Sequence, residues 1–309
     1  MTGEFTREET EFSSKGIRCA ATVFRPRVEN AQAGVPVVVM AHGFAGARAH
    51  RLFAYAAVFA EAGYLAVVFD YRGWGDSDGV PRHVLSIGDQ LDDWRAALGF
   101  ARALPGADPG RIVAWGTSFS GGHVITLAAS GEPLEALIAQ VPHVSGPAAV
   151  RAKGLLSGIR LLPAAIEDTV RGLLGREPRY IGSIGRPGDL AVLTSPDAVP
   201  GLDRMERDSG LDGSEYPRTV AARIVAHIGF YSPGRRAAAV ACPALIQIAR
   251  TDVVTPATTA RSTAARMSAA TVREYDLGHF DCYVAPAFPT IITDQLNFLK
   301  STVPIHAGR

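Results

Sequence analysis

The sequence predicts an α/β fold, a mostly parallel, doubly wound sheet with an inserted, mainly helical lid. Continuous apolar runs, such as residues 35–40, are typical of strands that are buried on both faces of a sheet. These runs alternate with segments that suit helices, which indicates right-handed βαβ crossovers and a parallel sheet. The alternation stops after residue 145 and resumes near residue 242, and a connection of about ninety residues is far longer than usual.

The first part of the chain has the pattern of a hairpin followed by alternating strands and helices. Two stretches of alternating residues flank a turn at residues 13–16, which predicts a β-hairpin over residues 4–26. A polar linker precedes the first buried strand. We then expect strands over residues 35–40, 64–70, 111–117 and 134–141, and helices over residues 51–62, 87–103 and 123–129.

The interrupting stretch is interpreted as a lid over the carboxyl ends of the strands. Disorder is the alternative, but leucine, isoleucine and aromatic residues are too frequent for it. The expected organisation is a core in two parts, residues 1–145 and 237–309, around a lid at residues 146–236. Within the lid we expect helices over residues 148–162, 164–174, 200–207 and 218–229, and a Gly- and Pro-rich stretch over 180–197. In the second core part we expect strands over 244–249 and 271–277, and helices over 257–268 and 290–301.

Composition and charge exclude several classes of protein. The 309 residues are 47% hydrophobic and 20% charged, with a net charge of +1 from 31 basic and 30 acidic side chains. No basic stripe indicates nucleic-acid binding, and no polybasic amphipathic segment or long apolar stretch indicates a membrane. The charged N-terminal residues lack the apolar core of a signal peptide, so we expect a cytoplasmic protein. The sequence is compatible with a homodimer and leaves the oligomeric state open.

The cysteines give no sign of a metal or disulfide framework. Cys19, Cys242 and Cys282 are too few and too scattered for either. We therefore expect no metal site.

Residues 116–120, Gly-Thr-Ser-Phe-Ser, form the most informative motif. They follow β-branched Ile112 and Val113 and precede an apolar run that permits a helix. A strand–Gly-x-Ser-x-small–helix unit holds its serine in a strained turn and exposes the hydroxyl above the sheet edge, with a helix N-terminus behind it. Ser118 is therefore the predicted nucleophile, and Ser120 stands where the regular motif has glycine. A Ser- and Gly-rich turn without chemistry is the alternative interpretation.

A serine nucleophile needs a base and an acid that orients the base. Asp252 and His279 each follow a predicted strand, at the sheet edge where doubly wound folds bind ligands. The chain order Ser, Asp, His is the one expected for this architecture. Asp252 as a helix cap before Pro256 and His279 as an ordinary loop histidine are the alternatives. Asp281 competes as the acid, but it lies only two residues from the base.

Further residues are assigned around this predicted triad. The oxyanion of an acyl-transfer intermediate needs preorganised N–H donors, which we assign to the backbone of Phe119 and Phe44. His42 is interpreted as a structural residue of the Phe44 loop. His143 and Tyr231 are candidates for the substrate pocket. Three other attractive features are assigned structural roles: His123 packs in its helix, the Asp-rich loop at residues 70–79 is a hydrogen-bonded turn, and Cys282 is a small buried side chain.

The chain resembles the α/β-hydrolase superfamily, in particular the branch of dienelactone-hydrolase-like bacterial hydrolases and fungal polyketide transferases. The resemblance covers nearly the whole chain and is most specific at residues 69–79 and 115–123. It also includes residues 42–44, residues 194–198 and the surroundings of Asp252 and His279. It implies the α/β-hydrolase fold, the same three catalytic residues, and cofactor-free cleavage or transfer of an ester- or thioester-like acyl group. Dienelactone hydrolases proper use a cysteine nucleophile, so their substrate does not carry over.

The expected function is a serine hydrolase that cleaves a small to medium carboxylic ester or thioester through an acyl-enzyme intermediate. The alternative is an acyltransferase or thioesterase that releases or transfers a polyketide-like acyl group. A non-catalytic binding protein on the same fold is the third hypothesis. Epoxide and haloalkane hydrolysis are disfavoured, because those reactions place an aspartate where Ser118 stands. The expected partner is a small-molecule ester or acyl substrate.

Overall fold

The computed structural model describes residues 4–27 and 34–305 of the chain. The polar linker predicted before the first buried strand therefore lies largely outside the described residues. Among the described residues, no helix combines the length and the apolar character needed to cross a membrane.

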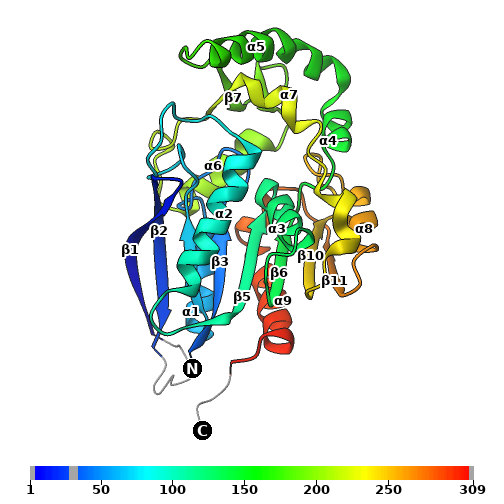
Figure 1. Cartoon of the computed structure of the whole chain (residues 1–309). Coiled ribbons are helices and arrows are strands. Elements are labelled where there is room, and N and C mark those ends of the chain that lie inside the picture. The colour runs from blue at the N-terminus through cyan, green and yellow to red at the C-terminus, as the bar shows by residue number, and fades with distance from the viewer. Residues whose placement is uncertain (1–3, 28–33, 306–309) are drawn as a thin grey trace.

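One sheet of eight strands forms the centre of the molecule, in the order β1-β2-β4-β3-β5-β6-β10-β11 (Figure 1). All neighbours from β4 to β11 pair in parallel, whereas β1 and β2 form an antiparallel hairpin at one edge. The predicted, mostly parallel sheet is confirmed. The strands are β1 (Phe5–Ser14), β2 (Ile17–Pro26), β3 (Val35–Ala41), β4 (Leu65–Phe69), β5 (Ala107–Thr117), β6 (Ala136–Gln140), β10 (Ala244–Ala249) and β11 (Ala270–Tyr275).

Burial explains why the central strands read as continuous apolar runs. Every residue of β3, β4, β6 and β10 is buried, because helices cover both faces of the sheet. Alternate residues of β3 enter opposite cores: Val37 and Val39 pack on one side, Val38 and Met40 on the other. The first core is completed by α2 (Ile87–Arg102), α3 (Phe119–Ala129) and α8 (Ala257–Ala264), and the second by α1 (Leu52–Glu61) and α9 (Phe288–Thr302).

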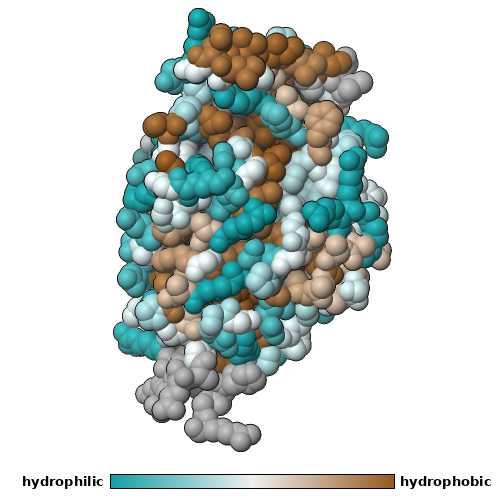
Figure 2. Space-filling view, in the orientation of Figure 1, coloured by the Kyte–Doolittle hydropathy of each residue, from teal (hydrophilic) through white to brown (hydrophobic). Residues whose placement is uncertain are grey.

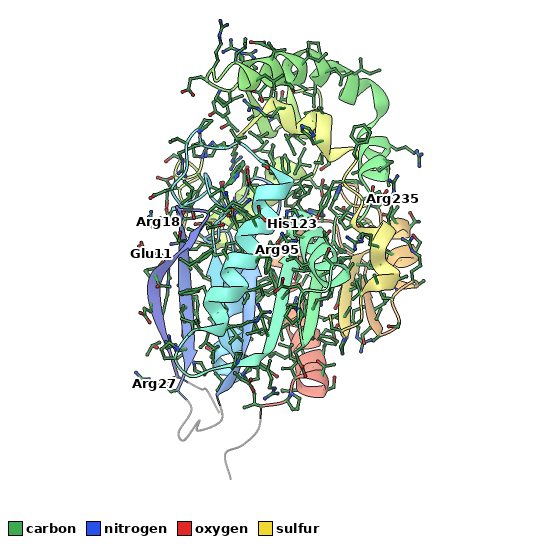
Figure 3. The ribbon with its side chains drawn as sticks, in the orientation of Figure 1. Glu11, Arg18, Arg27, Arg95, His123 and Arg235 are labelled. Atoms are coloured by element: carbon green, nitrogen blue, oxygen red, sulfur yellow. The ribbon has the colours of Figure 1, made fainter. Side chains whose placement is uncertain are left out.

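The outer hairpin strand protects the sheet edge with charge. β1 exposes the charged side chains of Arg7, Glu8, Glu9 and Glu11, and Glu11 forms an ion pair with Arg18 of β2 (Figure 3). Charged side chains on an edge strand discourage pairing with a strand of another molecule.

The residues between β6 and β10 form a separate layer beyond the carboxyl ends of the parallel strands (Figure 1). We call residues 146–236 the insertion. It consists of α4 (Gly146–Lys153), α5 (Leu155–Leu173), β7 (Tyr180–Ile184), β8 (Ala191–Leu193), α6 (Ala198–Asp208), β9 (Thr219–Ala221), the 3₁₀ turn η1 (Ala222–Ile224), α7 (Val225–Ile228) and the start of the 3₁₀ segment η2 (Pro233–Ala239). Its boundaries as a domain stay a prediction.

Some helices expected in the insertion have other bounds in the structure, and one stretch without an expected element contains strands. The break between the first two helices lies at Gly154 and not at Pro163, which is an exposed residue inside α5. Gly154 has φ of +89°, a conformation that ends a helix and that glycine adopts without strain. The Gly- and Pro-rich stretch contains β7 and β8, which form a small three-stranded sheet with β9. The helix expected over residues 218–229 is reduced to α7, because residues 219–221 pair with β7.

The long helix α5 is apolar on two opposite faces. The inner face of α5 buries Leu161, Ala164 and Ala165. On the other side, α5 and the residue after it expose a line of large apolar side chains, which Figure 2 shows as a continuous hydrophobic band over this helix: Ile159, Leu162, Ile166, Val170, Leu173 and Leu174.

Candidate active site

Ser118 occupies the sharp turn between β5 and α3. Its backbone has φ of 53° and ψ of −116°, an unfavourable conformation for a residue with a side chain. Surrounding hydrogen bonds maintain it: the N–H of Ser118 donates to Gln140 O at 2.8 Å, and its own carbonyl accepts from His143 N at 2.8 Å. The turn also requires glycine at position 116, because a Cβ there would lie 2.3 Å from Ser120 O. Local strain of this kind is typical of functional sites.

Ser120, the departure from the regular motif, has a specific environment. Its side chain is fully buried, and its hydroxyl lies 2.9 Å from the Tyr71 hydroxyl and 3.2 Å from Trp94 Nε1. A buried hydroxyl with two partners avoids the cost of an unpaired polar group. The serine therefore fits this position without disturbing the turn.

The structure brings together the three side chains predicted as a triad. His279 Nε2 lies 3.0 Å from Ser118 Oγ, and His279 Nδ1 lies 2.6 Å from Asp252 Oδ2. Asp252 follows β10 and His279 follows β11, so adjacent parallel strands deliver both residues to the same edge of the sheet. All three residues are at most 8% exposed. Hydrogen bonds at both imidazole nitrogens can pass a proton between the hydroxyl and the ring.

Asp252 is held as a charged carboxylate. Its Oδ1 accepts hydrogen bonds from the backbone N–H groups of Val254 and Thr255, each at 2.7 Å, and its Oδ2 accepts one from Thr255 Oγ1 at 2.7 Å. Burial alone raises the pKa of this carboxyl, but His279 and the Thr255 donors together lower it below its usual value. Thr255 was not expected at the site from the sequence, although it stands three residues after the acid.

The two residues expected to supply oxyanion donors, Phe119 and Phe44, lie beside Ser118. Phe119 is the first residue of α3, where a helix leaves its N–H groups without intrahelical acceptors. Phe44 comes from the loop after β3 and lines the space around Ser118. Within residues 4–27 and 34–305, neither N–H has a hydrogen-bond acceptor. Both groups remain available to an external oxygen.

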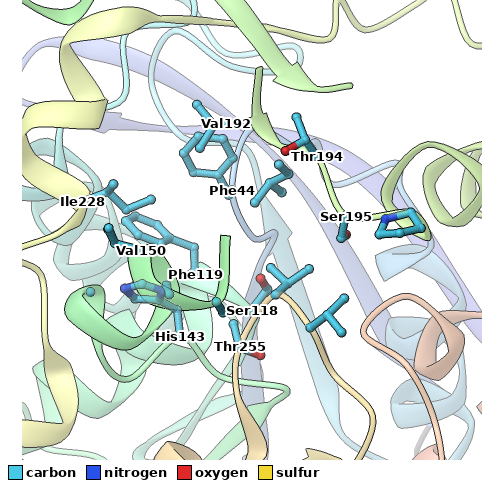
Figure 4. Close-up of a pocket in the computed structure, with 17 residues that line it drawn as sticks. Phe44, Ser118, Phe119, His143, Val150, Val192, Thr194, Ser195, Ile228 and Thr255 are labelled. Carbon is cyan, nitrogen blue, oxygen red and sulfur yellow. The ribbon is translucent and has the colours of Figure 1, made fainter. Parts of the chain in front are cut away.

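A cavity of about 370 Å³ opens beside Ser118 (Figure 4). Its wall is mostly apolar and comes from both parts of the molecule. The core contributes Phe44, Phe119 and Val254, and the insertion contributes Ala149, Val150, Val192 and Ile228. An apolar cavity with a few polar groups at one end is the usual form of a small-molecule site.

The two candidate pocket residues occupy different places. His143 lines the apolar cavity, and its ring stacks on Tyr231 at 5.9 Å between centroids. Tyr231 lies behind His143 and is not part of the cavity wall. Its hydroxyl contacts His123 Nδ1 at 2.7 Å and Thr126 Oγ1 at 3.0 Å, so it points into the core and away from the cavity.

The remaining candidates have structural partners. Asp281 accepts from the N–H of Gly278 and pairs with Arg204, so it does not contact the base. His42 Nδ1 lies 2.9 Å from Gly43 O in the loop that carries Phe44.

The Asp-rich loop and Cys282 are also accounted for by their hydrogen bonds or burial. Asp70 in the Asp-rich loop pairs with Arg48 and accepts from the N–H of Asp76. Burial raises the pKa of the Cys282 thiol well above its usual value.

A second, smaller cavity was not expected from the sequence. It has a volume of about 60 Å³, and Ser118 and His279 are part of its wall. Its wall is mostly apolar, but it includes the polar side chains of His50, Ser183, Glu206 and Arg218. These residues come from separate elements of the core and the insertion, so no local motif in the sequence marks them.

A parallel sheet covered on both faces, with a serine at a strand–helix turn and an insertion after β6, defines an enzyme of the α/β-hydrolase superfamily. Residues 15–181 match the family model described as X-Pro dipeptidyl-peptidase (S15 family), and the chain belongs to this family.

The chain also resembles three characterised proteins in different degrees. The quorum-quenching protein AidA of Acinetobacter baumannii (strain MDR-ZJ06) is 39% identical over 297 residues, 96% of this chain and 95% of AidA. The thiohydrolase apmlB of Arthrinium phaeospermum is 32% identical over 170 residues, 55% of this chain and 54% of that protein. The crystal structure of the α/β hydrolase GrgF from Penicillium sp. sh18 superposes with a TM-score of 0.79 and 21% identity, over 97% of this chain and all of GrgF, which shows a shared fold. The chain is thus an enzyme of hydrolase or acyl-transfer type.

Proposed function

We propose that the chain is a serine hydrolase that cleaves a small to medium carboxylic ester through Ser118, His279 and Asp252. The observation that carries this proposal is the continuous hydrogen-bonded chain from Ser118 Oγ through both nitrogens of His279 to Asp252, at 3.0 and 2.6 Å. It ends at the mouth of an apolar cavity that can take an acyl group. We also propose that the insertion acts as a lid, since it supplies part of that cavity's wall.

The proposed reaction follows from the geometry. Ser118 Oγ attacks the carbonyl carbon while His279 Nε2 takes its proton, and Asp252 stabilises the resulting imidazolium. The N–H groups of Phe44 and Phe119 hold the oxyanion, and such donors are worth about 3–4 kcal/mol each. The ring then returns the proton to the leaving oxygen, which departs as an alcohol. Water, activated by the same histidine, releases the acid from Ser118 and restores the enzyme.

Replacement of the nucleophile tests this proposal. Ser118→Ala should reduce the hydrolysis of p-nitrophenyl esters by about 10⁴-fold or more, because loss of the nucleophile removes the covalent route. It should also abolish labelling by a fluorophosphonate probe, with the circular-dichroism spectrum unchanged. Ser130→Ala is the matched control, since Ser130 follows the other end of α3 and is exposed. An unchanged turnover in Ser118→Ala rejects the proposed nucleophile.

Acyl transfer is the second candidate, favoured by the names of the relatives. One of them is a thiohydrolase, and GrgF is named a polyketide transferase at 24% identity over 273 residues. Transfer differs from hydrolysis only in the nucleophile that enters during deacylation. Product analysis with and without an alcohol acceptor separates them: free acid alone in both cases rejects transfer.

Substrate screening can begin from the relative that matches nearly the whole chain. AidA is named for quorum quenching, so we propose that ester-containing signals of bacterial cell density are tested first. Cytoplasmic location and a homodimer stay predictions of the sequence.

A further inference from the structure

Ser118 lies where two cavities meet. Both walls are mainly apolar, but the small cavity also carries the polar side chains His50, Ser183, Glu206 and Arg218. Ser118 and Phe44 line both cavities, so an ester bound at the hydroxyl can place one half in each. The question is which half occupies the small cavity.

The position of His279 answers this question under the proposed function. The imidazole must give its proton to the oxygen of the leaving alcohol. This oxygen therefore has to lie on the same side of Ser118 as the imidazole ring. His279 lines the small cavity and is not part of the wall of the large one. The acyl half then extends into the apolar cavity. We infer that the small cavity is the alcohol site and that it selects a short alcohol with a second hydroxyl, bound between His50 and Glu206.

His50 presents a donor to this cavity. The N–H of Ala47 donates to His50 Nδ1 at 2.9 Å, so in the neutral ring the proton is on Nε2. His50 is only 5% exposed, and among the described residues its Nε2 has no hydrogen-bond partner. A buried donor without a partner is costly in a folded protein, and a bound ligand can satisfy it.

Glu206 presents an acceptor opposite that donor. Its Oε2 is held by Arg218 at 2.5 Å, which leaves Oε1 facing His50 Nε2 across 3.7 Å. Burial raises the pKa of Glu206, but the neighbouring His50 and Arg218 side chains outweigh it and lower the pKa, so the group stays a carboxylate. The gap is too long for a direct hydrogen bond. A hydroxyl can bridge it, because it accepts from one side and donates to the other.

The charge of the site restricts the alcohol further. Both charged side chains have counterions: Glu206 pairs with Arg218, and Arg218 also pairs with Asp203 at 2.6 Å. An anionic alcohol would place a second negative charge next to the Glu206 carboxylate without a free cation to offset it. The volume of about 60 Å³ favours a short alcohol. A short, neutral, polyhydroxylated alcohol fits both limits.

The chemical step remains the one proposed above. Ser118 Oγ forms a bond to the acyl carbon, the bond from that carbon to the alcohol oxygen breaks, and the proton from Ser118 leaves on the alcohol. The second hydroxyl takes no part in bond changes. It places the leaving oxygen within reach of His279 Nε2.

A pair of esters that differ by one hydroxyl tests the inference. The 2-hydroxyethyl and propyl esters of one straight-chain acid have the same number of heavy atoms, and the acid is chosen by a scan of chain lengths. Wild-type enzyme should show a kcat/KM about 10-fold or more higher for the 2-hydroxyethyl ester, because the propyl ester leaves the His50 donor and Glu206 acceptor unpaired. Equal values within twofold, with Ser118 still labelled by a fluorophosphonate, overturn the inference and leave the proposed function standing.

Two variants test whether Glu206 and His50 cause the difference in kcat/KM between the two esters. Glu206→Gln and His50→Gln should each bring the ratio of the two kcat/KM values close to 1. Asp203→Asn is the matched control: Asp203 lies on the same helix as Glu206 and also pairs with Arg218, but it does not line the cavity. Its ratio should equal that of the wild type. A ratio unchanged in both glutamine variants rejects the assigned residues. Labelling without turnover of either ester series rejects the inference, and absence of both labelling and turnover rejects the proposed function itself.

Discussion

The sheet core and the insertion are built on different principles. In the core, strands β3, β4, β6 and β10 are buried along their whole length, and helices α1, α2, α3 and α9 turn their apolar residues toward the sheet. In the insertion, strands are three to five residues long and the longest helix exposes apolar side chains to solvent. Individual polar contacts hold the insertion together, and one of them is the pair of Asp168 with Arg223.

This contrast teaches where rigidity is concentrated. The proposed nucleophile, acid and base all stand on core elements, which can maintain hydrogen bonds of 2.6 and 3.0 Å at the site. The insertion supplies walls to both cavities, and we propose that its residues there select the substrate. The proposed chemistry thus lies on the continuously packed core and the proposed specificity on the insertion.

The largest expected effect is a loss of core stability in mild acid. Burial lowers the pKa of His42 to about 4, of His123 to about 3 and of His143 to about 4. The unfolded chain binds protons at these residues below pH ~6.5, whereas the folded chain does not. Between pH 7.5 and pH 5 the free energy of unfolding should therefore fall by about 2 kcal/mol for each histidine, and above pH ~6.5 they contribute nothing. Urea unfolding at several pH values measures this slope.

The variant His123→Gln tests whether the pH dependence of the free energy of unfolding comes from the buried histidines of the core. His123→Gln keeps a side chain that can hydrogen-bond Gln90 and Tyr231, the present partners of His123. Its stability should depend less steeply on pH than that of the wild type. A free energy of unfolding that is constant from pH 5 to pH 7.5 would contradict the burial of neutral histidines.

The same contrast explains how much the sequence could predict. A strand such as β3 is buried on both sides, so its apolar composition alone identifies it. The turn at Ser118 could be identified from the residues next to it, because a strand pattern precedes the serine and a helix pattern follows it. Asp252 and His279 could be placed because parallel strands end at one edge. Residues 219–221 form a strand only because β7 lies beside them, a contact that local patterns do not contain. His50 and Glu206 are brought together by the packing of the insertion on the core, so the alcohol site had no signal in the sequence.

A second substitution, Asp168→Ala, removes contacts inside the insertion and leaves the residues of the candidate active site unchanged. Asp168 on α5 is fully buried and accepts hydrogen bonds from the backbone N–H groups of Arg179 and Arg223 and from the Arg223 guanidinium. Asp168→Ala leaves these donors unpaired, which should cost about 3 kcal/mol. Because the lost contacts lie within the insertion, hydrogen exchange and limited proteolysis should increase there and not in the sheet.

Glu167→Gln is the matched control for that change. Glu167 is the preceding residue, but it is exposed and pairs only with surface arginines, so its loss should alter stability by less than about 0.5 kcal/mol. Equal protection of the insertion in Asp168→Ala and wild type would show that the buried pair does not hold α5 in place.

The smallest expected effect compares two leucines, one from each region. Leu173 at the end of α5 is 83% exposed, whereas Leu98 of α2 is fully buried. Leu173→Gln should change the free energy of unfolding by less than about 0.5 kcal/mol, since it removes no packed contact. Leu98→Ala should cost about 2–5 kcal/mol through lost burial and the cavity left behind. Both values come from urea unfolding at pH 7.5. A cost above about 1 kcal/mol for Leu173→Gln would mean that the apolar band of α5 is covered in solution, and the insertion would then be packed on both faces as the core is.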